Sequence, residues 1–452
     1  MPAEGNTASA SFLRKAPKSV YIKGTTIKSF EQLNLHPDIL KAIQHAKYEQ
    51  ATEIQNKVIP LALKGVDLLG ASKSGTGKTA AYVLPLLNKL QKIVKKEQKV
   101  LRALIIVPTI ELVDQVSRTI SELSKYLDIT NVKIQGGIPK STQLARLAQG
   151  ADIVVATPGR LQSFIEDKKI NLEHINTVIL DEADTMLELG FLEEIKAILK
   201  HCKQPRQMMM FSATISQNIK KLAKEFMRGE AAMIEVNQRR DVVEIISHRA
   251  YKVDRKRKEE LVARLIQDMH MEQVLLFAST KESANAIYEY LKSHQIRASI
   301  IHGDLNRGAR AKSLALLKSG KTQVLVATDI AARGIDIKEL AMVINYDIPE
   351  GTDDFTHRVG RTGRANHKGS VISILTTRDY NAFSKMERDL KLNIKREIYP
   401  GFELTDTQPR QKQPKKKSLI EKKCGFDYHK QKMEKRRGQS RSASANKKPA
   451  ER

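Results

Sequence analysis

The sequence predicts an α/β protein in which two parallel-sheet domains are joined by a short linker and followed by a disordered basic tail. Two observations support this fold class. At 452 residues the chain is too long for one ordinary core and suits a small number of domains of roughly 100–200 residues each. In addition, short β-branched runs alternate with helical patterns in two separate series, which is typical of parallel sheets covered by helices.

The first series indicates a domain over residues 29–236. Its predicted strands are ALIIV (103–107), VKIQ (132–135), DIVVAT (152–157), TVILD (177–181) and MMMFSAT (208–214). The second series indicates a domain over residues 243–402, after a polar linker at 237–242. Its predicted strands are VLLFAST (274–280), ASIIHG (298–303), QVLVATD (323–329), AMVINYD (341–347) and SVISILT (370–376). No fixed-period repeat relates the series, but their similar patterns suggest two related sheets.

The two ends of the chain lack this periodicity. Residues 1–28 are rich in Ser, Ala, Lys and Gly, so we expect a flexible arm, although a weak transit peptide has a similar composition. The predicted tail spans residues 403–452, and its part from Gln408 to Arg452 carries 16 Lys+Arg and 4 Asp+Glu. Such a tail is either a solubility segment or an electrostatic contact for nucleic acid. Counterion release favours the second interpretation.

The whole chain is strongly basic, with 78 Lys+Arg against 51 Asp+Glu and a formal net charge of +27. This charge favours a polyanionic partner such as nucleic acid, with an anionic membrane surface as the alternative. No apolar run approaches the roughly 20 residues of a membrane span. Cys202 and Cys424 have neither disulfide nor metal-ligand spacing. We therefore expect a soluble, cytoplasmic protein without a zinc site.

A phosphate-binding loop is predicted between an apolar segment that ends at Gly70 and a helical run over 80–92. Glycines let backbone N–H groups close around phosphates, and a helix N-terminus adds positive potential. The candidate ATP ligands are Ser72, Lys73, Ser74, Gly75, Thr76, Gly77, Lys78 and Thr79. We expect Lys78 to reach the β- and γ-phosphates and Thr79 to bind Mg²⁺. Ser72 replaces the Gly of the strict pattern, so this motif alone leaves a flexible Gly-Ser loop as an alternative.

An acidic cluster over residues 181–184 follows one of the predicted strands. Proteins with a phosphate-binding loop hold the acidic partner of their metal at the end of such a strand. Asp181 is therefore the candidate Mg²⁺ ligand, and Glu182 is the candidate base that orients and deprotonates the attacking water. An acid-rich helix N-terminus would explain the position of these carboxylates but not their pairing with the loop.

Residues 181–184 read DEAD, and from Phe30 to about Pro400 the chain resembles a DEAD-box RNA helicase of superfamily 2 in its motifs and their order. The resemblance implies two RecA-like domains that use ATP and Mg²⁺. It also implies that Phe30 stacks on adenine and that Gln55 hydrogen-bonds the adenine edge, since an amide satisfies a donor and an acceptor together. The segment around Gln55 departs from the family at Lys47, Ala51 and Glu53, where Gly, Pro and Pro are usual.

RNA contacts are implied by further motifs of the family. The candidate RNA-binding residues are Pro108, Thr109, Gly137, Thr157 and Arg160 in the first domain, and Thr280, Gly303, Arg310, Thr328 and Arg333 in the second. They follow predicted strands, whose carboxyl ends share one edge of a parallel sheet. Two positions depart from the family pattern, because Ile110 replaces Arg and Arg307 replaces Gln.

The most specific motif of the second domain is HRVGRTGR, at residues 357–364. Arg361 and Arg364 are candidate arginine fingers for the γ-phosphate, and their spacing puts them on one face if this stretch is helical. The resemblance further implies nucleotide contacts by Gly334 and by Asp336, the latter at the ribose. It assigns the coupling of ATP state to RNA binding to Ser212, Thr214 and His357.

The expected function is an ATP-dependent RNA helicase, an ATP hydrolase stimulated by RNA. Two domains would close on single-stranded RNA and separate short duplexes locally and non-processively, or remodel RNA–protein complexes. Recognition would be sequence-nonspecific, because backbone and 2′-OH contacts dominate. An ATP-gated RNA clamp is the alternative, although Glu182, Arg361 and Arg364 are all present; a DNA translocase fits the motifs poorly.

Finer expectations concern the setting in which the protein works. We expect a monomer, with ribosomal or RNA-decay proteins as candidate partners. The compact core and basic tail are similar to bacterial RhlE-type members of the family.

Overall fold

The computed structural model describes residues 29–72, 75–91, 99–229, 231–236, 246–332, 340–362 and 369–405. The predicted arm, the predicted linker and the tail beyond residue 405 lie outside this part of the chain. Both sheets belong to one compact unit that ends at Glu403.

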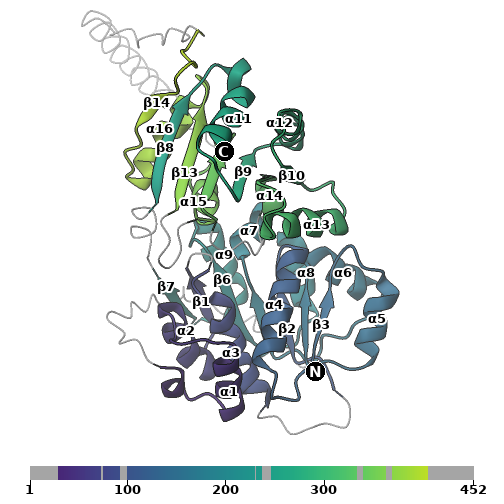
Figure 1. Cartoon of the computed structure of the whole chain (residues 1–452). Helices are drawn as coiled ribbons and strands as arrows, with labels where there is room; N and C mark the ends of the chain where they lie inside the picture. The colour runs from purple at the N-terminus through teal and green to yellow at the C-terminus, as the bar shows by residue number, and fades with distance from the viewer. Residues whose placement is uncertain are drawn as a thin grey trace, which may run out of the picture. The chain divides into compact units, whose positions relative to one another are not determined.

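The first sheet has seven parallel strands in the order β3-β4-β2-β5-β6-β1-β7 (Figure 1). The strands are β1 (Leu68–Ala71), β2 (Ala103–Ile106), β3 (Asn131–Ile134), β4 (Ile153–Ala156), β5 (Thr177–Leu180), β6 (Gln207–Ser212) and β7 (Ala232–Glu235). The helices are η1 (Phe30–Leu33), α1 (Pro37–His45), α2 (Glu53–Leu63), α3 (Lys78–Gln91), α4 (Ile110–Leu123), α5 (Lys140–Ala148), α6 (Pro158–Glu166), α7 (Ala183–Glu188), α8 (Leu192–Lys200) and α9 (Gln217–Phe226).

The second sheet has seven parallel strands in the order β10-β11-β9-β12-β13-β8-β14. The strands are β8 (Ser247–Lys252), β9 (Val274–Ala278), β10 (Ala298–Ile301), β11 (Val324–Thr328), β12 (Met342–Asn345), β13 (Ser370–Leu375) and β14 (Arg396–Ile398). The helices are η2 (Arg255–Arg257), α11 (Lys258–Asp268), α12 (Lys281–Ser293), α13 (Arg307–Lys318), α14 (Asp329–Ala332), α15 (Thr352–Val359) and α16 (Tyr380–Leu390).

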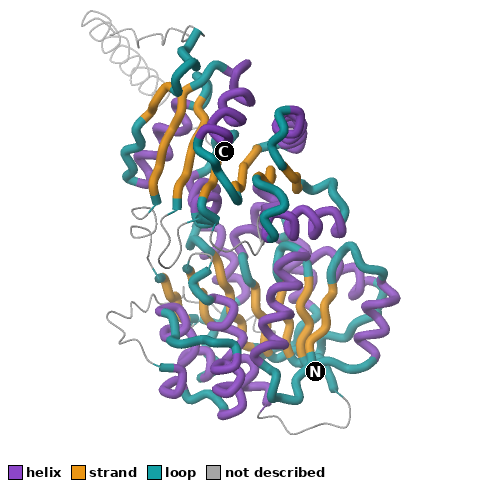
Figure 2. The backbone as a smooth tube through the Cα atoms, in the orientation of Figure 1, coloured by secondary structure: helices purple, strands orange, loops and turns teal. Residues whose placement is uncertain are grey.

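Each sheet is covered by helices on both faces, as Figure 2 shows for the strands and helices of the two halves. In β2, for example, Ile105 packs into one apolar cluster while Leu104 and Ile106 pack into the cluster on the other face. The second sheet does the same at β9, where Leu276 faces one cluster and Phe277 faces the other. Burial on both faces explains why these strands are continuous apolar runs in the sequence.

The predicted fold class of two related parallel sheets is confirmed, and each of the predicted strand segments contains a strand. Four of the observed strands had not been predicted as strands: β1, which was noted only as an apolar segment before the phosphate-binding loop, and β7, β8 and β14. Strands β7 and β14 lie at the edges of their sheets, where the apolar signal is short. Strand β8 has the sequence SHRAYK, in which four polar residues surround the buried pair Ala250 and Tyr251, so it does not read as an apolar run. Within the described segments, no helix is long and apolar enough to cross a membrane.

Candidate nucleotide and RNA site

The predicted phosphate-binding loop connects β1 to α3, at the carboxyl edge of the first sheet. Gly77 has a φ of 91°, and a Cβ there would lie 2.4 Å from Nε2 of Gln55, so the loop requires glycine at this position. Lys78 is the first residue of α3 and is 8% exposed. Its ammonium donates a hydrogen bond to the Ser72 carbonyl. The predicted ligands Lys73 and Ser74 lie outside the described residues.

The acidic pair follows β5, two strands away from the loop at the same edge. Asp181 is 4% exposed; its Oδ1 accepts the Glu182 N–H at 2.9 Å, and its Oδ2 accepts the Tyr82 hydroxyl at 2.9 Å. Glu182 precedes α7 in the left-handed region, with φ 52° and ψ 50°. Residues other than glycine rarely adopt this backbone conformation, and such strained residues cluster at functional sites.

Burial and charge shift the protonation of both carboxyl groups. Burial, assisted by the Asp181 charge, raises the pKa of Glu182 to about 7, while the Arg361 and Lys78 charges act in the opposite direction. Burial also raises the pKa of Asp181, against the influence of Lys78. A carboxyl group that titrates near neutral pH is suited to general-base catalysis. The crowding of carboxylates in the DEAD sequence is thus partly compensated by cations from both sheets.

Tyr82, on α3, connects the two residues that were predicted to hold the metal. Its hydroxyl donates to Asp181 and is itself hydrogen-bonded by the Thr79 side chain. Burial and the neighbouring Asp181 raise the pKa of Tyr82 well above its ordinary value, so the phenol stays protonated and remains a donor. Sequence reasoning missed this residue. The available signal was its spacing, since Tyr82 lies one helical turn after Lys78 and Thr79.

The oxygen donors at this site fit an Mg²⁺ ion that is bound together with a nucleotide. They do not fit a metal ion that is held by protein side chains alone. The Thr79 hydroxyl and the Asp181 carboxylate are both oxygen donors, which Mg²⁺ prefers. Among the described residues, no group of three or more His, Cys, Asp or Glu side chains could hold a metal. Mg²⁺ is usually held by one or two carboxylates together with water and substrate phosphates, so this sparse set suits an ion that arrives with a nucleotide.

The predicted adenine-reading residues lie next to the loop or in the core beside it. Gln55 is 3% exposed; its Oε1 accepts the Thr52 N–H at 2.9 Å, and its Nε2 donates to the Gly77 carbonyl at 3.2 Å. Phe30 is also 3% exposed, and its ring centroid lies 6.4 Å from that of Tyr48. Gln55 therefore joins α2 to the phosphate loop, and the adenine contacts of both residues stay predictions.

A second acid of the cluster reaches the segment that was predicted to couple the two ligands. Asp184 Oδ2 accepts the N–H groups of Ala213 at 2.9 Å and Thr214 at 3.3 Å, and the Ser212 hydroxyl donates to the Thr214 carbonyl at 2.6 Å. The end of β6 is thereby tied to the acidic cluster. Asp184 belongs to the DEAD motif, but no role of its own was predicted for it.

The second sheet contributes Arg361, but not from a helix. A shared helical face of Arg361 and Arg364 was expected only if this stretch is helical, and that condition is not met at Arg361, because α15 ends at Val359 and Gly360 forms its C-terminal cap. Arg361 follows in a turn, is 7% exposed, and its charge acts on Glu182. His357 is half-buried on α15. Arg333, Gly334, Asp336 and Arg364 lie outside the described residues.

Arg358, the neighbouring arginine of the same motif, has a structural environment. It is 1% exposed and forms two hydrogen bonds of 2.6 Å with the carboxylate of Asp329. Its guanidinium also lies 5.0 Å from the ring centroid of Phe277. Arg358 therefore stabilises the second sheet, while Arg361 is the one of these two described arginines whose charge acts on Glu182.

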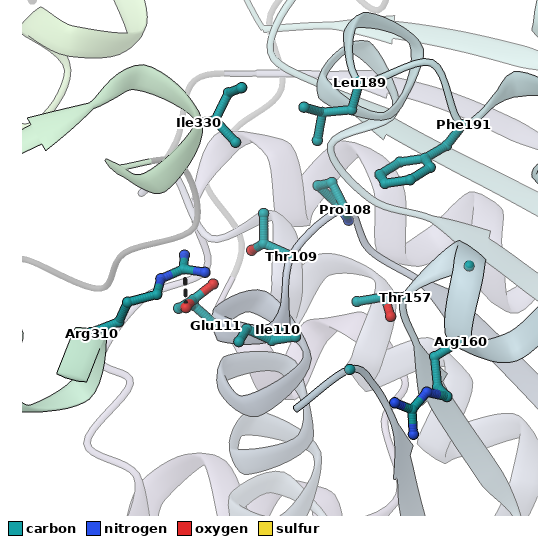
Figure 3. Close-up of a pocket in the computed structure, with 12 residues that line it drawn as sticks. Pro108, Thr109, Ile110, Glu111, Thr157, Arg160, Leu189, Phe191, Arg310 and Ile330 are labelled. Carbon is teal, nitrogen blue, oxygen red and sulfur yellow. Dashed lines mark ion pairs between the residues drawn. The ribbon is translucent and has the colours of Figure 1, made fainter. Parts of the chain in front are cut away.

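A cavity of about 460 Å³ collects many of the predicted RNA contacts (Figure 3). Its lining includes the predicted residues Pro108, Thr109, Thr157, Arg160 and Arg310. It also includes Ile110, Glu111, Gly136 and Gly159, which belong to the same sequence stretches as the predicted RNA contacts. Three further lining residues, Leu189, Phe191 and Ile330, had not been assigned to RNA, and Ile330 is 56% exposed.

Both sheets contribute to this cavity, and one ion pair crosses it. Arg310 Nη2 lies 2.9 Å from Glu111 Oε1, and these side chains are only 15% and 18% exposed (Figure 3). Arg160 Nη1 donates to the Ile138 carbonyl at 2.9 Å. Thr109 is the N-terminal cap of α4, and its hydroxyl accepts the Leu112 N–H at 3.4 Å. The cavity thus combines cationic groups, hydroxyl groups and an apolar wall.

The other described candidates lie at the carboxyl ends of neighbouring strands, beyond the lining that the described residues give this cavity. Gly137 follows β3, Gly303 follows β10, and Thr328 ends β11. Thr280 follows β9 and caps α12, where its hydroxyl accepts the Ser283 N–H at 3.1 Å. Each lies at the sheet edge that was predicted from its strand.

Comparisons with known proteins agree with this geometry. The DEAD/DEAH box helicase model matches residues 52–222, and the helicase conserved C-terminal domain model matches residues 257–366. The DEAD-box ATP-dependent RNA helicase CshA of Geobacillus kaustophilus is 36% identical over 81% of this chain and 78% of its own length. The ATP-dependent RNA helicase CshA of Listeria monocytogenes is 38% identical over 80% of this chain and 69% of its own length.

Solved structures with a similar fold include proteins bound to RNA and nucleotide analogues. Dbp5 of S. cerevisiae bound to RNA and ADP BeF3 has a TM-score of 0.74 and 30% identity, and the match covers 82% of this chain and 96% of that one. Mss116p bound to single-stranded RNA and AMP-PNP has a TM-score of 0.74 and 25% identity, with 85% and 81% covered. These matches do not test the RhlE-like branch, which stays a prediction.

Proposed function

The chain belongs to the DEAD-box helicase family, and from this premise we propose that it is an ATP-dependent RNA helicase whose ATP hydrolysis is stimulated by RNA. One observation carries the proposal: the buried Lys78 and Asp181 and the half-buried Glu182 lie at one edge of the first sheet, and the charge of Arg361 from the second sheet acts on the Glu182 carboxyl group. The relatives reported above are named as ATP-dependent RNA helicases, which supports the same conclusion.

In the proposed reaction, the phosphate loop and Lys78 bind the ATP phosphates, and Asp181 and Thr79 hold Mg²⁺. When bound, Mg²⁺ would neutralise phosphate charge and favour attack at the γ-phosphorus. Glu182 orients a water molecule and accepts its proton, for which a pKa of about 7 is suitable. Arg361 stabilises the negative charge of the transition state.

The RNA chain would occupy the cavity of Figure 3 and the strand ends beside it. Arg160 and Arg310 supply positive charge for phosphates, Thr109 and Thr157 supply hydroxyl groups, and glycines allow close approach of the backbone. Because Arg310 is paired with Glu111, an RNA phosphate that binds Arg310 must replace or share this carboxylate. These contacts are to backbone groups, so binding would be sequence-nonspecific.

ATP and RNA would be coupled because each site uses residues of both sheets. Differential affinity of the two ligands for the closed arrangement links their binding thermodynamically. The contacts of Asp184 with Ala213 and Thr214 offer a direct mechanical connection from the acidic cluster to β6. Closure on one strand would separate a short duplex locally and without processive movement. We further propose a cytoplasmic monomer, with ribosomal or RNA-decay proteins as candidate partners.

The deciding experiment measures ATP hydrolysis by the full chain with and without single-stranded RNA, and unwinding of a short labelled duplex with ATP. We expect RNA to accelerate hydrolysis and ATP to be required for strand separation. An ATP-gated clamp would retain RNA with ATP but leave the duplex intact. Hydrolysis that responds to DNA and not to RNA would contradict the proposal.

A further inference from the structure

Tyr82 occupies a position that no motif assigns. Its side chain is 0% exposed, and its hydroxyl lies 2.9 Å from Asp181 Oδ2 although the two residues are 99 positions apart. The same hydroxyl is hydrogen-bonded by Thr79. One phenol therefore contacts both side chains that are proposed to hold Mg²⁺.

The surrounding core fixes the orientation of this phenol. The Tyr82 ring lies against Phe211 of β6, with ring centroids 5.1 Å apart and an interplanar angle of 45°. Phe211 in turn fills space beside Gly70 of β1, where an added Cβ would lie 2.8 Å from the Phe211 ring. Packing against three elements, α3, β6 and β1, therefore holds the Tyr82 side chain in place and fixes the position of its hydroxyl.

The hydrogen bonds of Asp181 leave its carboxylate in a defined orientation. Oδ1 accepts the Glu182 N–H, and Oδ2 accepts the Tyr82 hydroxyl, so rotation of the carboxylate would break both bonds. A carboxylate oxygen has more than one lone pair, and each oxygen therefore keeps capacity for a cation. Groups that orient a metal ligand in this way are known to affect metal affinity strongly.

We infer that Tyr82 is a positioning residue for Mg²⁺: its hydroxyl orients Asp181 and Thr79 so that the two oxygen ligands meet the ion brought by the nucleotide. The inference rests on the proposed function. It concerns the hydroxyl alone, since a phenylalanine at this position would fill the core equally well.

The test is Tyr82→Phe in the full chain, with binding of a fluorescent ATP analogue titrated at a series of Mg²⁺ concentrations and in EDTA. We expect the Mg²⁺ concentration that gives half-maximal binding to rise by about 10-fold, the lower end of the range for partners of metal ligands. In EDTA the variant and the wild type should bind the analogue equally, and saturating Mg²⁺ should restore the affinity.

Tyr346→Phe is the matched control. Tyr346 is 4% exposed in the second sheet, and its hydroxyl donates to Glu259 Oε1 at 2.6 Å, so this change also removes a phenol–carboxylate bond. It should leave the Mg²⁺ dependence unchanged.

Thermal unfolding checks that each variant is folded, and a Mn²⁺ titration followed by electron paramagnetic resonance measures metal binding in the nucleotide complexes of the wild type and of Tyr82→Phe, in which we expect Mn²⁺ to bind about 10-fold more weakly. If Tyr82→Phe folds and shows the wild-type Mg²⁺ dependence, or loses affinity equally in EDTA, the inference is wrong while the proposed function stands. If the wild type itself binds nucleotide without regard to Mg²⁺, the proposed function fails, and the inference fails with it.

Discussion

The two sheets share one strand order, yet they use the same positions differently. Numbered from the first strand of each sheet, both orders read 3-4-2-5-6-1-7. Lys78 begins the helix after β1, and Lys258 begins the helix after β8 in the corresponding place. Asp181 follows β5, and Asp347 follows the corresponding strand β12. Each sheet thus places a lysine and an aspartate at its carboxyl edge.

In the second sheet these two residues are bound to each other. Lys258 Nζ lies 2.5 Å from Asp347 Oδ1, and the Ser283 hydroxyl and the Ser279 N–H donate to Oδ2. Burial opposes ionisation of Asp347, but Lys258 and these donors outweigh it and lower the pKa of Asp347. The segment between β8 and α11 contains no glycine, whereas the loop before Lys78 contains Gly75 and Gly77.

The first sheet keeps its lysine and its acid on other partners. Lys78 donates to a carbonyl, and Asp181 accepts from a phenol and an N–H group, while burial raises the pKa of Asp181. In the second sheet, the corresponding Lys258 and Asp347 form a stabilising ion pair. The fold places a lysine and an aspartate at the carboxyl edge of both sheets. We infer that the loop glycines, and the groups to which this lysine and this aspartate are bound, decide whether the edge can bind phosphate.

Glu182→Gln should have the largest effect, because the first sheet loses its proposed base while its binding groups remain. We expect ATP hydrolysis to fall by about 10²–10⁴-fold, with nucleotide and RNA affinity nearly unchanged. Steady-state hydrolysis and equilibrium binding on the same preparation check this. Near-wild-type turnover would remove Glu182 from the mechanism.

Arg361→Ala tests a contribution that the second sheet makes to the chemistry. RNA-stimulated hydrolysis should fall by about 10²–10³-fold, as expected when a preorganised donor is lost from a transition state. ATP binding should not change. Arg364→Ala is expected to behave alike from the sequence motif, and Arg388→Ala, an exposed arginine of α16, is the matched control. Equal loss of activity in Arg388→Ala would contradict a specific role for Arg361.

Lys78→Met and Lys258→Met test the comparison directly. The first should weaken ATP binding with little loss of stability. The second should lower the free energy of unfolding by about 1–3 kcal/mol, between the values for exposed and buried ion pairs, and leave ATP binding intact. Urea unfolding and ATP titration of both variants measure the two effects. If Lys258→Met weakened ATP binding and Lys78→Met lowered only the stability, the proposed roles of the two lysines would be wrong.

The stability effect of Lys258→Met should also depend on pH. Because the folded pKa of Asp347 is lowered, its contribution is present above the ordinary carboxyl pKa and is lost as pH falls through the folded value. The gap between wild type and variant should therefore narrow in acid. A gap that stays constant down to the acid-unfolding range would show that packing, and not charge, explains the loss.

Deletion of Gln408–Arg452 should have the smallest effect on the chemistry. If the tail neutralises Z phosphates, its removal should flatten the log–log salt dependence of single-strand binding by about 0.7Z. Turnover at saturating RNA should stay close to that of the full chain, because the proposed catalytic groups precede the tail. An unchanged slope would reduce the tail to a solubility segment.

Local patterns predicted much of the fold and of the candidate site. Lys78, Asp181 and Glu182 could be brought together from sequence because parallel strands end at one edge. The bond between Tyr82 and Asp181 could not be predicted in this way, since it depends on how α3 packs against β5 and β6. The turn at Gly360, which ends α15 before Arg361, could not be predicted for a similar reason: a helix end is decided by a cap that spacing alone does not reveal.

Gln55 has a consequence for attempts to change the nucleotide that this chain uses. One end of its amide holds the first turn of α2, and the other end holds the backbone at Gly77. A replacement that cannot form both bonds would disturb the phosphate loop whichever base the nucleotide carries. The family resemblance assigns base recognition to the same residue, so we expect base preference and phosphate affinity to change together when Gln55 is replaced. An engineer seeking a GTP-driven version would therefore have to keep Gln55 and introduce the new base contacts elsewhere.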